Sequence, residues 1–321
     1  MVNGADGLAI ETRGLGKSYG GLVALKSLDL QVRRNSIFGI LGPKGAGKTT
    51  VIRLLLGLTA PTGGSGIVLG QDIVRHSLEL RERVGYLSEE PFYHEHMTAR
   101  ETLHFALRSF HGAPAEVIGM RVEETLEVVG LMDKADYPVK ELSPDERQRL
   151  SIGQAQVNHP ELLILDEPAG DLLPPGRQEV LSVLESLRTS TTIVYATHMV
   201  EDVQQVSDTV AILSHGELVA CTPFENLRAS PSWAVFTVVI KGDPSEAHGR
   251  VVAQPWVSDI STTTENDQTT WLVRVTDETI AEAELLRLVL RDERVAVTGF
   301  GRKGYELESI SVSMANGEAT R

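Results

Sequence analysis

The chain has 321 residues, of which 41% are hydrophobic, and its formal net charge is −14. This length predicts about two domains, with enough apolar residues for ordinary cores. The acidic balance argues against nucleic acid as a partner, because that binding depends on neutralising phosphates with Lys and Arg. The single cysteine, Cys221, cannot form an internal disulfide, which fits a reducing cytoplasm and a packing role for this side chain.

The first residues, MVNGADGLAIETRG, lack the basic start and apolar centre of a secretory signal. No window of the sequence approaches the roughly 18 consecutive apolar residues that a membrane-spanning helix needs. We therefore expect a cytoplasmic protein, with any membrane part of its function supplied by another chain.

Strands are expected first at Leu8–Thr12, Leu28–Val32 and Ile37–Leu41. An exposed stretch that contains Tyr19 lies between the first two, and we expect this tyrosine in a loop. Its ring can stack on an adenine base, and it can equally serve in ordinary packing. The sequence leaves both interpretations of Tyr19 open.

A glycine-rich turn and an amphipathic helix follow Ile37–Leu41 directly. Residues Gly42–Thr49, GPKGAGKT, match the phosphate-loop pattern in residue type and spacing. Glycines let the backbone wrap a phosphate with its N–H groups pointing inward, and the helix N-terminus adds free N–H groups and its positive dipole end. Lys48 is expected to reach the β- and γ-phosphates and Thr49 to bind Mg²⁺. The predicted nucleotide-binding residues of this segment are Gly42, Lys44, Gly45, Ala46, Gly47, Lys48, Thr49 and Thr50.

Further along, the glycines between positions 63 and 70 punctuate short strands and predict a small antiparallel sheet. From Pro91 to about His159 the apolar spacing becomes helical, which predicts an inserted helical lobe.

Two further strands carry polar residues at their ends. The run Glu161–Glu167, ELLILDE, fits a central strand of a parallel sheet, whose carboxyl edge is where ligands bind. Asp166 is placed there to hold Mg²⁺ through water, and Glu167 to orient or deprotonate the water that attacks the γ-phosphorus. Beyond the strand Thr192–Ala196 lies His198. A histidine just beyond a core strand is usually structural when considered alone. Because the phosphate loop and the LILDE strand precede it in this chain, His198 is expected to contact the γ-phosphate.

We place the first domain at residues 1–225, with Val210–Leu213 and Glu217–Cys221 as its last strands. The second domain is placed at 233–315 and is predicted to be a small α+β unit. It has no catalytic constellation, and regulation or dimerisation is its expected role. Its expected elements are the helix Glu278–Arg291 and the strands Val235–Ile240, Val257–Thr263, Trp271–Val275 and Val295–Gly299.

Taken in this order, Tyr19, the phosphate loop, the LILDE strand and His198 resemble an ATP-binding cassette (ABC) ATPase over about residues 8–222. The resemblance implies an α/β fold: a P-loop, RecA-like core with an antiparallel β subdomain and an inserted helical lobe. It also implies that the cassette closes head-to-tail on a second cassette with ATP at each interface, and that hydrolysis drives a membrane partner. The tail is similar to the C-terminal accessory domain of drug-efflux exporter subunits.

The sequence departs from this family's pattern at three places. Glu89 stands where the family has a glutamine, and its carboxylate can still ligate Mg²⁺ as a hard oxygen donor. Pro144 and Asp145 stand where the family has two glycines after the signature serine, and Leu173 replaces a loop aspartate. Ser143, Pro144 and Glu146 instead fit a helix capping box.

The resemblance and the departures together predict an ATP-hydrolysing subunit that energises a membrane exporter. The expected cofactors are ATP and Mg²⁺, and the expected catalytic residues are Lys48, Glu167 and His198. The expected partners are a polytopic membrane permease and a second ABC ATPase subunit, with a heterodimer favoured over a homodimer. Alternatives are a nearly non-hydrolysing partner subunit and an ABC regulator that acts away from membranes.

Overall fold

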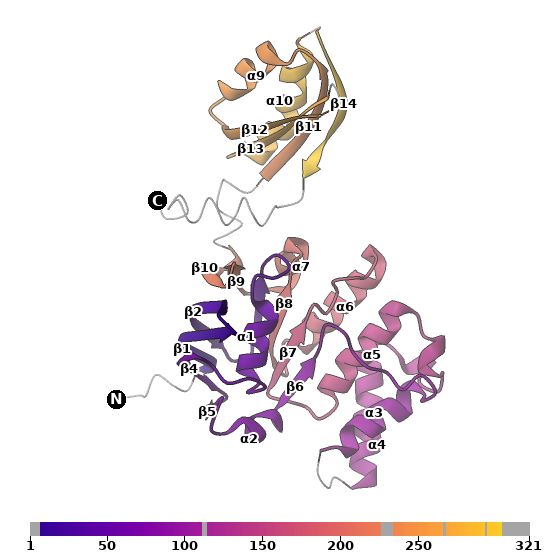
Figure 1. Cartoon of the computed structure of the whole chain (residues 1–321). Coiled ribbons are helices and arrows are strands. Elements are labelled where there is room, and N and C mark those ends of the chain that lie inside the picture. The colour runs from indigo at the N-terminus through magenta and orange to yellow at the C-terminus, as the bar shows by residue number, and fades with distance from the viewer. Residues whose placement is uncertain (1–6, 111–113, 226–233, 266–267, 293, 304–321) are drawn as a thin grey trace. The chain divides into compact units, whose positions relative to one another are not determined.

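The computed structural model describes residues 7–110, 114–225, 234–265, 268–292 and 294–303 (Figure 1). It divides into two compact units, Met1–Pro223 and Phe224–Arg321. The first unit ends at Pro223, two residues before the predicted end of the first domain at residue 225. Residues 226–232, between the two predicted domains, and the predicted end of the second domain at 315 lie outside the described residues. Each unit has its own hydrophobic core and is considered separately.

The first unit is built on a six-stranded sheet with the order β10-β9-β3-β8-β7-β6. All neighbouring strands in this sheet are parallel except β10 and β9, which form an antiparallel pair. Its strands are β3 (Ile37–Leu41), β6 (Val84–Leu87), β7 (Leu162–Asp166), β8 (Thr192–Thr197), β9 (Thr209–Ser214) and β10 (Glu217–Pro223).

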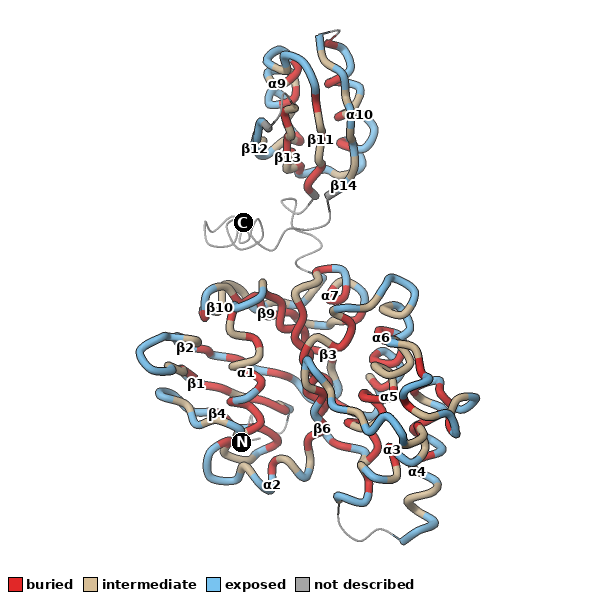
Figure 2. Tube along the Cα trace, turned by 45° about the vertical axis from the view of Figure 1, so that its right-hand side comes forward, coloured by how far each residue is buried: buried red, intermediate tan, exposed pale blue. Residues whose placement is uncertain are grey.

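The centre of this sheet is buried on both faces. Every residue of β3, β7 and β8 is buried. The trace around the label β3 in Figure 2 is accordingly red. Continuous apolar runs such as IFGIL and LLIL suit this position because helices cover both faces of a parallel sheet. The helices of the core are α1 (Lys48–Leu55), α2 (Ser77–Arg81), α6 (Pro174–Leu187) and α7 (Val200–Val206). The carboxyl ends of β3, β7 and β8 therefore meet at one edge.

A second, antiparallel sheet has the order β2-β1-β4-β5. Its strands are β1 (Leu8–Tyr19), β2 (Leu22–Arg33), β4 (Gly63–Val68) and β5 (Gln71–Asp72). The prediction that Tyr19 lies in a loop was wrong, because β1 and β2 are longer than expected and Tyr19 pairs with Leu22 in their ladder. Gly20 and Gly21 close this hairpin with φ of 54° and 93°, a conformation that favours glycine.

The helical lobe lies between β6 and β7 in the chain, as predicted. Its elements are α3 (Ala99–Arg108), α4 (Ala115–Val128), two short 3₁₀ turns η1 (Met132–Lys134) and η2 (Val139–Glu141), and α5 (Pro144–Gln156). The buried positions Leu103, Val122, Leu126 and Leu150 come from all three helices and join them into one packed body.

The second unit has a four-stranded antiparallel sheet, ordered β12-β13-β11-β14, and residues 234–303, as far as they are described, add the helices α9 and α10. The chain order β-α-β-β-α-β is that of a ferredoxin-like fold. Its elements are β11 (Ala234–Gly242), α9 (Ser245–Val252), β12 (Val257–Glu265), β13 (Gln268–Val275), α10 (Glu278–Leu290) and β14 (Val295–Lys303). The sequence analysis missed α9, a two-turn helix of which only Ala247 and Val251 are buried.

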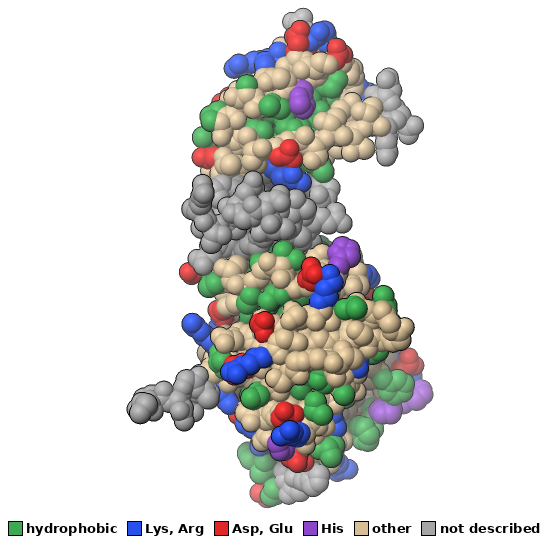
Figure 3. Space-filling model, turned by 60° about the vertical axis from the view of Figure 1, so that its left-hand side comes forward, with side chains coloured by type: hydrophobic (Ala, Val, Ile, Leu, Met, Phe, Trp, Pro, Cys, Tyr) green, Lys and Arg blue, Asp and Glu red, His purple; other side chains and the backbone are tan. Residues whose placement is uncertain are grey.

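The surface of the first unit requires one further correction. Cys221 was predicted to pack, but it is exposed, because β10 is the edge strand of its sheet and none of the residues of this strand is buried. On the face drawn in Figure 3, side chains of both charge signs are interspersed over this unit. None of the described helices is both long enough and apolar enough to cross a lipid bilayer.

Candidate functional site

The phosphate loop, Gly42–Thr49, connects β3 to α1 in a conformation that only glycines adopt without strain. Gly45 and Gly47 have φ of 82° and 104°. A Cβ on Gly42 would lie 2.6 Å from the Leu213 carbonyl oxygen, and one on Gly47 would lie 2.8 Å from the Ala24 carbonyl oxygen. No side chain of the described residues caps α1, and its first turn holds no acidic residue. The helix N-terminus thus presents N–H groups and a positive dipole end suited to phosphate.

The Lys48 ammonium group is buried within this loop. Its Nζ donates hydrogen bonds to the carbonyl oxygens of Gly42, at 2.8 Å, and Pro43, at 3.2 Å. It also lies 3.2 Å from Oε1 of Glu167, and the two side chains are only 7% and 10% exposed. An unpaired buried charge is costly, so Glu167 stabilises the lysine in the state seen here.

Glu167 links this lysine to His198. Its second oxygen, Oε2, lies 3.0 Å from His198 Nδ1 and 3.4 Å from the His198 backbone N–H. Glu167 has φ of 50°, an unusual value for a residue with a side chain, and its own N–H donates to the Ala196 carbonyl. This strained conformation turns the carboxylate back over the edge of the sheet. The structure therefore brings together the three residues that were predicted to be catalytic.

Asp166 is the last residue of β7 and is 1% exposed. Neither carboxylate oxygen has a hydrogen-bond partner among the described residues. Burial raises the pKa of Asp166, and Glu89 and Glu167 raise it further, while Thr49 and Lys48 act in the opposite direction. A buried acid with free oxygens beside a threonine hydroxyl suits a hard divalent cation such as Mg²⁺, which would neutralise these carboxylates. Thr49 and Glu89, the other two predicted metal-binding residues, thus both influence the pKa of Asp166.

A cavity of about 380 Å³ lies beside the phosphate loop and has an apolar wall that the sequence analysis missed. Leu22 and Val23, 72% and 50% exposed, contribute this wall. Tyr19 pairs with Leu22 across the hairpin, and the Lys17 ammonium lies 4.8 Å from the centre of its ring. The remaining lining residues are Ala24, Gly45, Gly47, Lys48, Thr49, Thr50, His215 and Gly216. The residue types of Leu22 and Val23 do not show that they line a cavity. Alignment with a relative of known structure could have shown it.

The segment that departs from the family signature begins α5. Ser143 caps the helix: its Oγ accepts from the Glu146 N–H at 3.3 Å, and its own N–H donates to Glu146 Oε2 at 2.8 Å. The predicted capping box is confirmed. The Ser143 hydroxyl also donates to Asp145 Oδ1 at 2.8 Å. The helix therefore uses this serine for its own N-terminus, and Pro144 has no N–H to offer.

Leu173 precedes α6 and is 80% exposed. The N-termini of α5 and α6 lie side by side, because a Cβ placed on Gly176 would be 2.6 Å from the Asp145 Cβ. The signature segment and the Leu173 segment thus belong to one surface of the first unit.

These features define a P-loop nucleotide-binding ATPase. Comparison with known proteins adds the family: the model described as "ABC transporter" matches residues 25–170. An uncharacterised ABC transporter ATP-binding protein of Nostoc sp. is 41% identical over 65% of this chain and 62% of its own length. The bacitracin transport ATP-binding protein of Bacillus licheniformis is 36% identical over 68% of this chain and 71% of its own.

Two further similarities agree. The Nod factor export ATP-binding protein I of Cupriavidus pinatubonensis is 39% identical over 66% of this chain and 65% of its own. The solved structure of cbiO1 from Clostridium perfringens, part of the ABC transporter complex cbiONQ, superposes with a TM-score of 0.64. It is 25% identical and the match covers 70% of this chain and 91% of that one. The chain belongs to the family of ABC transporter ATP-binding proteins and is an ATPase.

Replacing Lys48 by alanine should remove most of the affinity for ATP. A hydrogen bond from a charged donor contributes about 1.5–3 kcal/mol, which corresponds to roughly a 10- to 150-fold rise in the dissociation constant. Equilibrium titration with a fluorescent ATP analogue measures this. Lys26→Ala is the matched control, because Lys26 is an exposed lysine that pairs with Glu217. Equal affinities of Lys48→Ala and the unmodified chain would place the nucleotide elsewhere.

Proposed function

We propose that this chain is the ATP-hydrolysing subunit of a membrane exporter and works in an asymmetric pair with a different cassette. The observation that carries the proposal is the chain of contacts from Lys48 through Glu167 to His198 at the carboxyl edge of the sheet. The names of relatives involved in bacitracin transport and Nod factor export support the choice of an exporter.

In hydrolysis, Lys48 and the loop N–H groups hold the phosphates, and the phosphate charge draws Lys48 away from Glu167. Glu167 is then free to orient or deprotonate the attacking water. His198 lies 3.0 Å from Glu167 and holds that carboxylate in place. We also assign the His198 ring to the γ-phosphate. Mg²⁺, when bound by Thr49 and Asp166, neutralises charge on the β- and γ-phosphate oxygens. Glu89 is the third oxygen donor that we assign to this cation.

The asymmetry follows from Ser143–Asp145. In a head-to-tail pair this segment faces the nucleotide held by the other cassette. The Ser143 hydroxyl and N–H are used within the helix, and Asp145 would place a carboxylate near the partner's phosphate. At about 5 Å and an effective dielectric of about 20, two unit charges repel by roughly 3 kcal/mol. We therefore assign an impaired site to the partner's nucleotide and a competent site to this chain's own.

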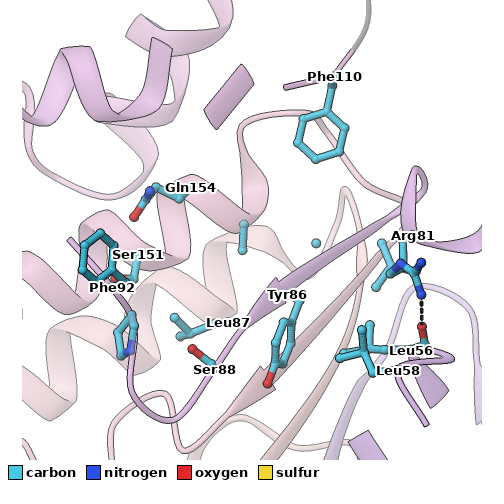
Figure 4. A pocket seen from close by; sticks show the side chains of 14 residues that line it. Leu56, Leu58, Arg81, Tyr86, Leu87, Ser88, Phe92, Phe110, Ser151 and Gln154 are labelled. Carbon is cyan, nitrogen blue, oxygen red and sulfur yellow. Dashed lines mark hydrogen bonds between the residues drawn. The ribbon is translucent and has the colours of Figure 1, made fainter. Parts of the chain in front are cut away.

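A groove between the core and the helical lobe is the surface that we assign to the membrane permease. It has a volume of about 380 Å³, and Tyr86, Phe92 and Phe110 line it together with residues of α5 (Figure 4). Phe92 is 80% exposed, and the nearby Leu58 is 52% exposed. Exposed aromatic residues around a groove are typical of a protein–protein contact. Through this contact the chain would lie on the inner face of the membrane, and the second unit would serve as an accessory domain.

Replacing Glu167 by glutamine should slow hydrolysis by at least about 10²-fold, the scale of a lost general base. Binding of ATP should persist, because Lys48 and the loop glycines remain. Single-turnover hydrolysis of bound ATP measures the rate. Glu161→Gln, at the other end of the same strand and paired with Arg34 and Arg83, is the matched control. Turnover at the unmodified rate in Glu167→Gln would mean that another group activates the water. No hydrolysis by the unmodified chain, even beside an intact partner, would favour the non-hydrolysing alternative.

Restoring glycines at Pro144 and Asp145 should strengthen ATP-dependent pairing of the chain with itself. A homodimer faces the repulsion at both sites, so its relief should shift the dimer population by about a hundredfold or more. Sedimentation with Mg-ATP in the Glu167→Gln background, which traps closed pairs, measures this. Pro114→Gly with Asp133→Gly, an exposed proline and acid in the same lobe, is the control. A tight homodimer with the unmodified segment, or no gain from the glycines, would contradict the asymmetric pair.

A further inference from the structure

We propose that Asp202 and Arg177 are positioning residues for hydrolysis: they hold the turn Thr197–Met199 so that His198 stays against Glu167. This inference rests on the proposed function, because it assigns His198 and Glu167 a part in ATP hydrolysis. The route runs from α6 through α7 to the end of β8. Neither Asp202 nor Arg177 belongs to a motif that the sequence analysis found, and neither lines the cavity beside the phosphate loop.

The turn Thr197–Met199 is bonded both to the phosphate loop and to Glu167. The Thr197 carbonyl accepts a hydrogen bond from the Gly42 N–H at 3.1 Å, which joins the turn to the phosphate loop. His198 meets Glu167 through both its ring nitrogen and its backbone N–H. A movement of this turn therefore changes the distance between His198 and Glu167 and the start of the phosphate loop together.

The Thr197 side chain fixes the shape of the turn. Its hydroxyl accepts from the Met199 N–H at 3.0 Å and donates to Asp202 Oδ2 at 3.3 Å. The residues on both sides of His198 are thus held by one hydroxyl group, and that hydroxyl is oriented by Asp202. Thr197 and Asp202 are 0% and 1% exposed, so water does not compete for these bonds.

The positive charge of Arg177 favours the ionised form of Asp202. The Arg177 Nε lies 3.7 Å from Asp202 Oδ1, which is too long for a hydrogen bond, and neither atom has another hydrogen-bond partner among the described residues. Burial raises the pKa of Asp202, and Arg177 and Thr197 act to lower it. A buried carboxylate that keeps one oxygen unsatisfied is expensive for the fold, so a purely stabilising role explains it poorly.

Arg177 connects this acid to the surface that carries Leu173. Its backbone N–H donates to the Leu173 carbonyl at 2.9 Å, in the first turn of α6. Contact of a second cassette with the exposed Leu173 would therefore reach the turn of His198 through the Arg177–Asp202 pair and the Thr197 hydroxyl. The 3.7 Å separation leaves room for that pair to shorten when α6 is pushed toward α7.

The test is a mutant cycle on the full chain, read as the single-turnover rate of bound ATP. Asp202→Asn should lower the rate roughly 10- to 100-fold, the effect of a small misplacement of catalytic groups. ATP affinity should stay within about 2-fold, because the phosphate-loop contacts are intact. In a His198→Ala background, followed over hours, Asp202→Asn should have no further effect beyond about 2-fold, because its influence passes through His198.

Arg177→Gln should behave as Asp202→Asn does, and the two together should cost no more than either alone. The matched control is Arg188→Gln, which removes an arginine–carboxylate contact with Asp208 at the other end of α6 and should leave the rate unchanged. If Asp202→Asn does not fold, Thr197→Val removes the same link and retains the Asp202 carboxylate beside Arg177.

Two results would overturn the inference. One is an unchanged rate in Asp202→Asn, and the other is an equal loss with and without His198, which is what a purely structural role produces. Failure of the proposed function would give a different result. The unmodified chain and every variant would then hydrolyse no ATP, although each of them would still be folded.

Discussion

The architecture of the site depends on the buried charge of Lys48. The ammonium group is held by two loop carbonyls and by Glu167, in a region where the lysine is only 7% exposed. That arrangement requires β3 and β7 to end at the same edge of a parallel sheet, with β8 between them to supply His198. The energetic consequence is a competition. In the function that we propose, a bound phosphate would compete with the Glu167 carboxylate for the Lys48 ammonium group, so nucleotide binding would also release Glu167.

The signature segment matters because of the free N–H groups at a helix N-terminus. A helix N-terminus can satisfy its own N–H groups or offer them to an anion, and in α5 the capping box of Ser143 and Glu146 does the first. In α1 no side chain of the described residues competes, because Gly47 stands at the cap. The two helix ends therefore differ in what they leave free: α5 uses the side chains of Ser143 and Glu146 at its own N-terminus, whereas no described side chain caps α1.

The sequence predicted those parts of the fold whose residues carry both pattern and chemistry. The phosphate loop and the LILDE strand have a spacing that few other structures use, so their positions at the sheet edge followed directly. Tyr19 was misplaced because pairing with Leu22 extends β1 beyond its apolar residues. The wall formed by Leu22 and Val23, and the Asp202–Arg177 pair, could not be foreseen. They depend on contacts between segments far apart in the chain, which residue type does not specify. The short helix α9 was missed because it buries too few side chains to show a period.

The central claim is that this chain has a competent nucleotide site and an impaired signature segment. Mixing two forms of the chain tests it most directly. One form carries Lys48→Ala with Pro144→Gly and Asp145→Gly, so it offers a repaired signature but no site of its own. Added to the unmodified chain, it should raise ATP hydrolysis at least about tenfold above the sum of the two forms alone, since removal of roughly 3 kcal/mol of repulsion favours pairing. Hydrolysis in the mixture no faster than that of the unmodified chain alone would contradict the account.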